Sequence, residues 1–483
     1  MSAFRDMLLN QAFYSFDYNL GNAAMVLGNY DEAQFIYLRG LNRFPDHSAI
    51  MYNLADVLDA KSRREEAASL RHRALEINPD VLALCAYDLG ETLMIQGRQN
   101  EAAERFRTVL AHNPDHGDAR YRLARLLWCC AAKSEALQII FESEALPQEC
   151  FAPNQLVNLL GMVAAESSEA ELNRLSARAL AAAPSSFPTR LKVARAGYRF
   201  GWFDRAIALL LKTDVVKGED DYYDCNLELA SLWIMRGQFG NALPALQKLF
   251  DVYHDFETSR ARTVALRMAS CQLAVGQLAA AEKLSSALLT RDPKFGEARF
   301  QLGSLRMAED RIADAAVEFQ RGFVDGDLTC GVFLGLTRVM AGEFALAQGV
   351  LAQLRSGGED APWIDCLSGI LCLHQGDPQK AESLFASVVA KDPTTPMFAS
   401  WLGLAFHAQG RIDQALEVHR RAIVSVPYSP WERINLSLAL QADGRLEEAL
   451  AIRHEVQRSL PGNYRQQQRW RPLWAQAMMR ESE

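Results

Sequence analysis

Apolar and small residues recur along the chain with a period close to 34 positions. Leucine followed by glycine or alanine returns in one register, at Leu20-Gly21, Leu54-Ala55, Leu89-Gly90, Leu302-Gly303 and Leu402-Gly403. Prolines punctuate the same period at Pro45, Pro79, Pro114, Pro293, Pro393, Pro427 and Pro461. Because proline ends helices and keeps the preceding residue extended, the pattern predicts pairs of helices separated by proline joints.

Two small residues in each unit have distinct expected roles. The first lies in the Leu-Gly or Leu-Ala pair and lets the two helices of a unit approach closely. The second is a glycine just past the first helix, where a left-handed cap is easiest without a Cβ. These turn glycines are Gly28, Gly97, Gly201, Gly237, Gly276, Gly342, Gly376, Gly410 and Gly444.

Together, these residues and their spacing resemble the tetratricopeptide repeat, a helix–turn–helix unit of 34 residues. The resemblance implies an all-α fold, namely a right-handed superhelical solenoid of antiparallel helix pairs. About thirteen units are predicted: 14–47, 48–82, 83–117, 118–150, 151–186, 187–222, 223–261, 262–295, 296–327, 328–361, 362–395, 396–429 and 430–463. The unit at 151–186 lacks the turn glycine and carries Glu166 to Glu169 instead.

Insertions at residues 217–221 and 251–257 are predicted to be surface loops that the fold tolerates. In the alternative, they bend the array into two arms. We therefore expect an N-terminal array over 1–222 with about six repeats, of which 118–186 depart most from the pattern. A C-terminal array of about seven repeats is expected over 223–463. Residues 464–483 are expected to form a capping helix, because the last unit of a stack needs a covering face.

Composition narrows the function classes. Apolar residues make up 49% and charged residues 23% of the chain, a globular balance, and the net charge is −8. This balance lacks the basic excess of a general nucleic-acid binder, so nucleic acid is not expected as a partner. No apolar run is long enough for membrane insertion and no signal sequence begins the chain. Nine cysteines without a CxxC pair fit free core thiols in a reducing cytoplasm, the expected location.

Motifs of catalysis and cofactor binding are missing from the sequence. There is no phosphate-binding glycine loop, HExxH or GxSxG motif. His112 and His116 have half of a metal-site spacing, but they flank Pro114 in a joint with no further ligand pair. No catalytic residue, metal or cofactor is therefore expected, and the chain is not predicted to be an enzyme.

By resemblance, the first helix of each repeat lines a concave surface that holds a partner protein. In the first three repeats this surface is predicted to be polar and able to bond an extended peptide backbone, through Asn19, Asn22, Asn53, Asp56 and Asp88. Asn22 and Asn53 match two positions of the family's carboxylate clamp. Its basic positions are occupied by Tyr18, Leu84 and Asp88, so binding of chaperone C-termini is rejected.

A basic zone follows and would suit an acidic peptide or, as an alternative function, RNA. Its site residues are Arg120, Arg122 and Arg125, with Lys192, Arg195 and Arg199 further on. A solvated helix face is the competing interpretation of such scattered arginines.

Ten apolar residues repeat at 34-residue spacing in the C-terminal array and are predicted to line its groove. They are Phe333, Leu336, Trp363, Leu367, Ile370, Met397, Trp401, Leu404, Trp431 and Leu438. An open apolar stripe of this kind favours an amphipathic helix or an extended apolar segment as the guest. In the alternative, a tightly wound superhelix or a C-terminal helix with Trp470 and Trp474 covers the stripe.

The function that follows is a scaffold or adaptor that binds a partner protein in the concave groove. The first alternative is a substrate-recruiting or regulatory subunit of an enzyme complex, for example in cell-envelope polysaccharide, protein glycosylation or secretion machinery. The sequence leaves the identity of the partner and the oligomeric state open.

Overall fold

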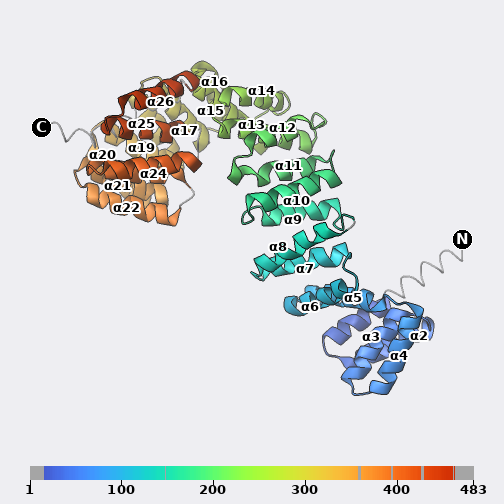
Figure 1. Ribbon diagram of the computed structural model, residues 1–483. Helices are drawn as coiled ribbons and strands as arrows, with labels where there is room; N and C mark the ends of the chain where they lie inside the picture. The colour runs from blue at the N-terminus through green and yellow to red at the C-terminus, as the bar shows by residue number, and fades with distance from the viewer. Residues whose placement is uncertain are drawn as a thin grey trace. The chain divides into compact units, whose positions relative to one another are not determined.

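A computed structural model describes residues 16–146, 148–356, 361–392, 395–425, 429–460 and 462. In this part of the chain every regular element is a helix, and consecutive helices within each compact unit pack as antiparallel pairs (Figure 1). The all-α array of helix pairs predicted from the 34-residue period is thereby confirmed.

The first five pairs have the following bounds: residues 16–26 with α2 (Tyr30–Arg43); α3 (Ser48–Ala60) with α4 (Arg64–Ile77); α5 (Val81–Ile95) with α6 (Gln99–His112); α7 (Gly117–Cys129) with α8 (Lys133–Glu142), followed by the 3-10 turn η1 (Ser143–Ala145); and α9 (Pro153–Val163) with α10 (Glu169–Ala182). Along the chain, α11 (Phe187–Ala196), the 3-10 turn η2 (Tyr198–Phe200) and α12 (Phe203–Leu211) come next.

The other seven pairs have these bounds: α13 (Asp220–Met235) with α14 (Phe239–Phe250); α15 (Ser259–Ala274) with α16 (Leu278–Arg291); α17 (Gly296–Ala308) with α18 (Ile312–Val324); α19 (Leu328–Met340) with α20 (Phe344–Ser356); α21 (Pro362–His374) with α22 (Pro378–Lys391); α23 (Pro396–Ala408) with α24 (Ile412–Ser425); and α25 (Pro430–Ala442) with α26 (Leu446–Ser459).

The chain divides into two compact units, residues 1–200 and 201–483. This division falls after η2, whereas the sequence division was placed at residue 222. Helix α11 packs on α9 and α10 within the first unit, and α12 packs on α13 within the second. Of the two insertions, 251–257 is a loop, but α13 already begins at Asp220. The predicted capping helix at 464–483 lies outside the described residues.

The turn inside a pair depends on one residue with positive φ. All nine predicted turn glycines adopt φ between 67° and 84°, as in Gly237 and Gly276. Three repeats lack the glycine and place Ser62, Ala131 or Asp310 in the same left-handed conformation. Non-glycine residues pay a steric cost there. The turn at Glu166–Glu169 is built differently, because Ser168 caps α10 instead.

The helices of a pair meet where a small residue faces a large one sixteen positions later. A Cβ added to Gly90 would come 2.8 Å from Phe106, and one added to Gly369 would come 2.6 Å from Phe385. The same contact joins Gly403 to His419, whose imidazole replaces the usual aromatic ring. The expected role of the first small residue is therefore confirmed.

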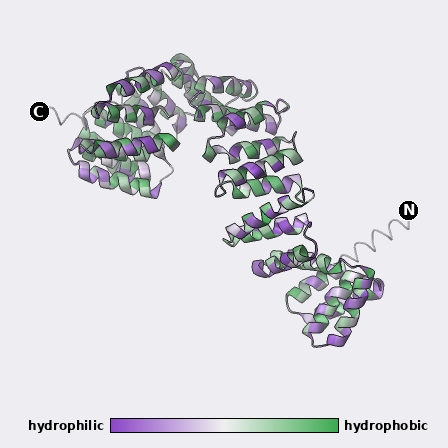
Figure 2. Ribbon diagram, viewed as in Figure 1, coloured by the Kyte–Doolittle hydropathy of each residue, from purple (hydrophilic) through white to green (hydrophobic). Residues whose placement is uncertain are grey.

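Most helices carry both polar and apolar residues (Figure 2), as expected for helices that pack on one side and meet solvent on another. Six of the nine free cysteines are buried, as expected. Cys129 and Cys130, at the end of α7, are exposed and Cys150 is intermediate, so the prediction of core thiols is wrong for these three. Among the described helices, none has the length and apolar character needed to cross a membrane.

Candidate protein-binding surfaces

A pocket in the first unit is lined by three consecutive repeats. Its walls come from the turn of the first pair, from α3, α5 and α6. The lining residues are Met25, Val26, Tyr30, Asp56, Ala60, Leu89, Leu93, Arg98, Glu101 and Arg105. Asp56 is the one predicted site residue among them. The pocket therefore combines apolar walls with several charged groups.

Most charges around this pocket are already paired. Asp56 accepts a hydrogen bond of 2.7 Å from Arg71, which also binds Asp59. Arg98 forms a two-point ion pair with Glu101 and donates to the carbonyl of Val26. These contacts fix the turn of the first repeat relative to α6.

Arg105 differs from these charges, because it is exposed and forms no ion pair with any residue in the described part of the chain. At the same register, α2 and α4 carry Ile36 and Leu70. A charged residue at a normally apolar position was the signal that the sequence interpretation missed. A carboxylate is the natural partner for such a guanidinium.

The polar zone predicted in the first three repeats is largely structural. Asn22 and Asn53 are fully buried, and the Asn53 amide donates to the Asn22 side-chain oxygen over 2.7 Å. The hydroxyl of Tyr37 donates to the same oxygen over 2.6 Å. The expectation that both asparagines are open to a peptide is wrong, because their side chains bond each other and Tyr37 between neighbouring helices.

Tyr18 and Asp88 occupy clamp positions where the family carries basic residues, and they bind each other. The Tyr18 hydroxyl donates to an Asp88 carboxylate oxygen over 2.8 Å. Burial raises the pKa of both groups. Asp88 is thus engaged within the fold, and of the five predicted polar residues only Asn19 is exposed.

The basic zone is engaged as well. Arg120 is only 6% exposed and donates to the carbonyls of Ile139 and Pro114, so its predicted availability to a partner is wrong. Its guanidinium ties the joint before α7 to α8. Arg122 forms a 2.9 Å ion pair with Glu91. Arg125 is exposed and lies over the ring of Tyr121.

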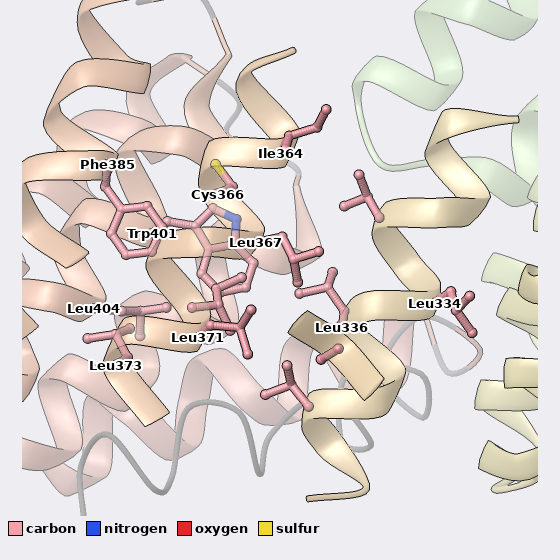
Figure 3. Packing of buried hydrophobic residues seen from close by; sticks show 14 of the residues in the cluster. Leu334, Leu336, Ile364, Cys366, Leu367, Leu371, Leu373, Phe385, Trp401 and Leu404 are labelled. Carbon is pink, nitrogen blue, oxygen red and sulfur yellow. The ribbon is translucent and has the colours of Figure 1, made fainter. Parts of the chain in front are cut away.

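The apolar stripe of the second unit is mostly core (Figure 3). Six of its ten side chains are at most 6% exposed: Leu336, Leu367, Ile370, Trp401, Leu404 and Leu438. The prediction that they line an open groove is wrong. The first helices of neighbouring repeats pack directly on one another, α19 on α21, α21 on α23 and α23 on α25, and these side chains fill the interfaces. Trp401, for example, stacks on Phe385.

The remaining four side chains, Phe333, Trp363, Met397 and Trp431, are partly exposed and pack against the edge of this core. Phe333 packs edge to face against Phe300. Trp363, Met397 and Trp431 occupy the second position of α21, α23 and α25. We call these three residues, two tryptophans with a methionine between them, the aromatic ladder. It is the part of the predicted stripe that is not fully buried.

His116, one of the two histidines considered for a metal site, has a structural role. Its Nδ1 accepts a hydrogen bond from the backbone N–H of Ala119 and so caps α7. His47 caps α3 in the same way, through the N–H of Ile50. Within the described residues no group of three histidine, cysteine, aspartate or glutamate side chains is arranged to hold a metal ion.

These stacked helix pairs define a helical-repeat scaffold. Two family models, both of the tetratricopeptide repeat, match the sequence. One matches residues 18–81 and 366–430, and the other matches residues 93–146. The chain is therefore a tetratricopeptide-repeat protein, as its sequence period indicated.

Two curated proteins are similar to part of the array. Protein arginine N-methyltransferase 9 of Homo sapiens is 31% identical over 137 residues, which make up 26% of this chain and 16% of that protein. Photosystem I assembly protein Ycf3 of Acaryochloris marina (strain MBIC 11017) is 37% identical over 84 residues, 17% of this chain and 47% of that protein. The chain thus spans less than half the length of both relatives.

Two solved structures share the helical arrangement at low identity. A chain of the APC/C hetero-tetramer Cut9-Hcn1 matches with a TM-score of 0.35 and 16% identity, covering 99% of this chain and 95% of that chain. A chain of Naa15/Naa10 bound to HypK-THB matches with a TM-score of 0.34 and 17% identity, covering 91% of this chain and 67% of that chain. At these scores neither resemblance bears on what this chain binds.

Proposed function

We propose that this protein is a non-catalytic adaptor that holds a segment of a partner protein in the pocket of its first three repeats. The observation that carries the proposal is the exposed Arg105 guanidinium beside an apolar wall, which forms no ion pair or hydrogen bond within the described residues. A segment with an acidic residue next to a large apolar one satisfies both features. The guest is an extended peptide, whose alternate side chains reach the wall and the guanidinium.

The pocket provides shape as well as charge. Leu89 and Leu93 are buried behind the wall, while Tyr30 is 40% exposed and forms a rim that a guest side chain can cover. Arg98 is held by Glu101 and by the Val26 carbonyl, so the wall is organised before binding. A preorganised site loses less conformational entropy on binding.

The aromatic ladder in the second unit supports a second contact, with an amphipathic helix. Trp363, Met397 and Trp431 stand on successive first helices and remain partly exposed. Tryptophan serves as a large anchor and methionine adapts to irregular surfaces. The pocket belongs to the first unit and the aromatic ladder to the second. The two surfaces would therefore bind either two motifs of one partner protein or two different partner proteins.

A role in assembling or recruiting other machinery fits the same surfaces. One relative is named a photosystem I assembly protein, and the similarity covers 84 residues of this chain. The alternative of an enzyme-recruiting subunit differs only in whether the captured partner is catalytic. The RNA alternative loses support because Arg120 and Arg122 are bonded within the fold.

The test compares the full chain with Arg105→Glu and with Arg64→Glu, a matched charge reversal at the exposed start of α4, outside the pocket. The binding probes are an array of extended peptides. Each peptide carries one Asp or Glu and one Leu or Phe, and the number of residues between the two is varied. We expect acidic–apolar peptides to bind the wild type and Arg64→Glu, and to bind Arg105→Glu at least about tenfold more weakly. Equal binding to all three proteins would refute the pocket assignment.

Affinity capture from lysate follows with the same three proteins. We expect a protein that contains the selected acidic–apolar motif to be recovered with the wild type and Arg64→Glu, and lost with Arg105→Glu. Trp363→Ala with Trp431→Ala tests the ladder separately. Recovery of nucleic acid that falls steeply with salt, and no protein, would favour the RNA alternative instead.

A further inference from the structure

The first helices of the repeats in the first unit change the sign of their charge halfway along. In repeats one to three, the helix of residues 16–26, α3 and α5 carry only acidic residues: Asp17, Asp56, Asp59, Asp88 and Glu91. In repeats four to six, α7, α9 and α11 carry one acidic residue, Asp118, and six basic ones: Arg120, Arg122, Arg125, Arg190, Lys192 and Arg195. A positive surface on a chain with a net charge of −8 favours contact with a negatively charged molecule.

Four of these six basic side chains are engaged within the chain. Arg120 and Arg190 donate to backbone carbonyls, Arg122 pairs with Glu91, and Arg195 also has a partner. The other two, Arg125 and Lys192, are exposed, and neither forms an ion pair or hydrogen bond with a residue in the described part of the chain. Of the basic zone predicted from the sequence, these two cations are therefore accessible.

Arg125 and Lys192 belong to one continuous strip across α7, α9 and α11, which lie side by side (Figure 1). The Arg125 guanidinium lies 5.5 Å from the centre of the Tyr121 ring. The Tyr121 hydroxyl accepts a hydrogen bond of 3.2 Å from the amide of Asn158 on α9. Three residues further along α9, a Cβ added to Gly161 would lie 3.6 Å from the Lys192 ammonium. We call Arg125, Asn158, Gly161 and Lys192 the basic strip.

The basic strip is open, and no carboxylate lies within it. All four of its residues are exposed. Helix α9, which separates the two cations, has no charged residue in its sequence. Asp118 is two turns away from Arg125 and accepts a hydrogen bond from Gln155. Gly161 has no side chain, so the backbone of a bound segment can approach α9 closely at this point.

We propose that the basic strip binds an extended acidic segment of a partner protein, with one carboxylate on Arg125 and a second on Lys192. Both cations form charge-assisted hydrogen bonds with carboxylates. Lys192 leans onto α9, one helix away from Arg125, so the two charges are about 8–10 Å apart, the usual distance between packed helices. An extended chain advances about 3.3–3.6 Å per residue, so the two acidic residues should stand about two to four positions apart.

The surroundings of the basic strip favour a protein segment over RNA. A base of single-stranded RNA stacks on an open aromatic ring. On α7 and α11 the aromatic residues Tyr121 and Phe187 are buried and Trp128 is partly buried. Two accessible cations would also neutralise only two phosphates, which gives little electrostatic affinity for a nucleic-acid backbone.

Fluorescence anisotropy with the full chain tests the basic strip. The probes are labelled peptides of Gly and Ser that carry two Glu residues two to eight positions apart. We expect peptides with the closer spacing to bind the wild type, and to bind Arg125→Glu with Lys192→Glu at least about tenfold more weakly. The matched control, Arg64→Glu with Lys283→Glu, changes the net charge equally at exposed positions of α4 and α16 and should bind as the wild type does.

The basic strip and the pocket of the proposed function lie on different repeats, so Arg105→Glu separates them. Peptide binding that is lost with Arg105→Glu but kept with the strip variant would assign the peptide to the pocket and overturn the strip alone. A wild type that binds no peptide, or equal losses in the strip variant and its matched control, also overturns it. A labelled oligouridylate is the second probe, and tighter binding of this RNA than of every acidic peptide would overturn the protein assignment.

Gly161→Glu is a second test, because its carboxylate would stand beside the Lys192 ammonium and compete with the guest from within the chain. We expect this variant to bind the acidic peptides at least about threefold more weakly than Gly161→Gln, which has a neutral side chain of similar size. The added Cβ makes an ordinary contact with Lys192, so both variants should fold, and circular dichroism checks this. Equal peptide affinity of the two variants overturns the position proposed for the guest carboxylate.

Discussion

His419→Phe is expected to stabilise the second unit. His419 is fully buried, and neither ring nitrogen has a hydrogen-bond partner in the described part of the chain. Its imidazole packs against Gly403, as the fully buried rings of Phe319 and Phe385 pack against their glycines. The site is therefore shaped for a phenyl ring but occupied by a polar one.

The magnitude follows from the polar groups removed. A buried donor or acceptor without a partner costs about 1–3 kcal/mol. Phenylalanine removes that cost and adds apolar contact, while the Gly369–Phe385 pair shows that this geometry accommodates the larger ring. We expect His419→Phe to raise the free energy of unfolding by about 1–3 kcal/mol at neutral or slightly basic pH.

The effect grows as the pH falls. Burial, and then the neighbouring His407, lower the pKa of His419 from 6.5 to about 3. Below pH 6.5 the unfolded chain binds a proton that the folded chain rejects until about pH 3, so wild-type stability is lost across this window. At about pH 5 the loss from this residue is about 2 kcal/mol, which the variant avoids.

Urea unfolding at about pH 8 measures the stability gained by removing the unpaired polar groups. Urea unfolding at about pH 5 measures how much this gain grows when the unfolded chain binds a proton at His419. Tryptophan fluorescence follows the transition, because Trp401 lies on α23, the helix against which His419 packs. The stability difference between variant and wild type should be positive at both pH values and larger by about 2 kcal/mol at the lower one. His454→Gln, at an exposed position of α26, is the control. A difference that does not depend on pH refutes the reasoning.

Three further outcomes are expected. Ala131→Gly should stabilise the first unit by about 0.5–1 kcal/mol in urea unfolding, since alanine is strained at its φ of 61°. Gly97→Ala, with open space around the new Cβ, should cost about 1 kcal/mol for the converse reason, and an unchanged midpoint in either variant contradicts this account of the turn. Trp401→Ala should cost about 3–5 kcal/mol, because it empties a buried site. Trp363→Ala, at a partly exposed position, should cost clearly less, and equal losses on thermal unfolding would contradict the assignment of core and edge.

Local rules predicted the fold well, because each acts through a few neighbouring residues. A glycine after the first helix relieves the steric cost of positive φ, and all nine such glycines have it. A small residue opposite a ring sets the approach of the two helices, as Gly90 and Phe106 show. These requirements recur in the sequence with each repeat, so the period alone was enough to locate the helix pairs.

The candidate site was predicted less well, since a period of 34 does not say which face of a helix a position occupies. Trp401 and Trp363 share the spacing, but Trp401 lies between three helices and Trp363 at their edge. A first helix packs against its own partner and against the first helices on either side. In α21, nine of thirteen residues are buried, so few positions are left for a partner.

The predictions for polar residues were wrong because these residues are buried where exposure was expected. Asn22 and Asn53 were expected at the surface because amides are usually exposed, and a hydrogen bond between them allows both to be buried. Arg120 is buried by bonding two backbone carbonyls. The hydrogen bond between Asn22 and Asn53 joins residues 31 positions apart, and the local sequence around either residue does not predict it.

In a chain built from one repeated unit, packing accounts for the positions that keep the period. What packing leaves unexplained are the departures from it. Phe35 is apolar where the next repeat has Ser69, and Arg105 is charged where α4 has Leu70. Each costs free energy in isolation, the first by exposing a ring to water and the second by replacing an apolar contact with an exposed charge. A second molecule that covers the ring or supplies a carboxylate removes that cost, and these departures are therefore where binding should first be sought.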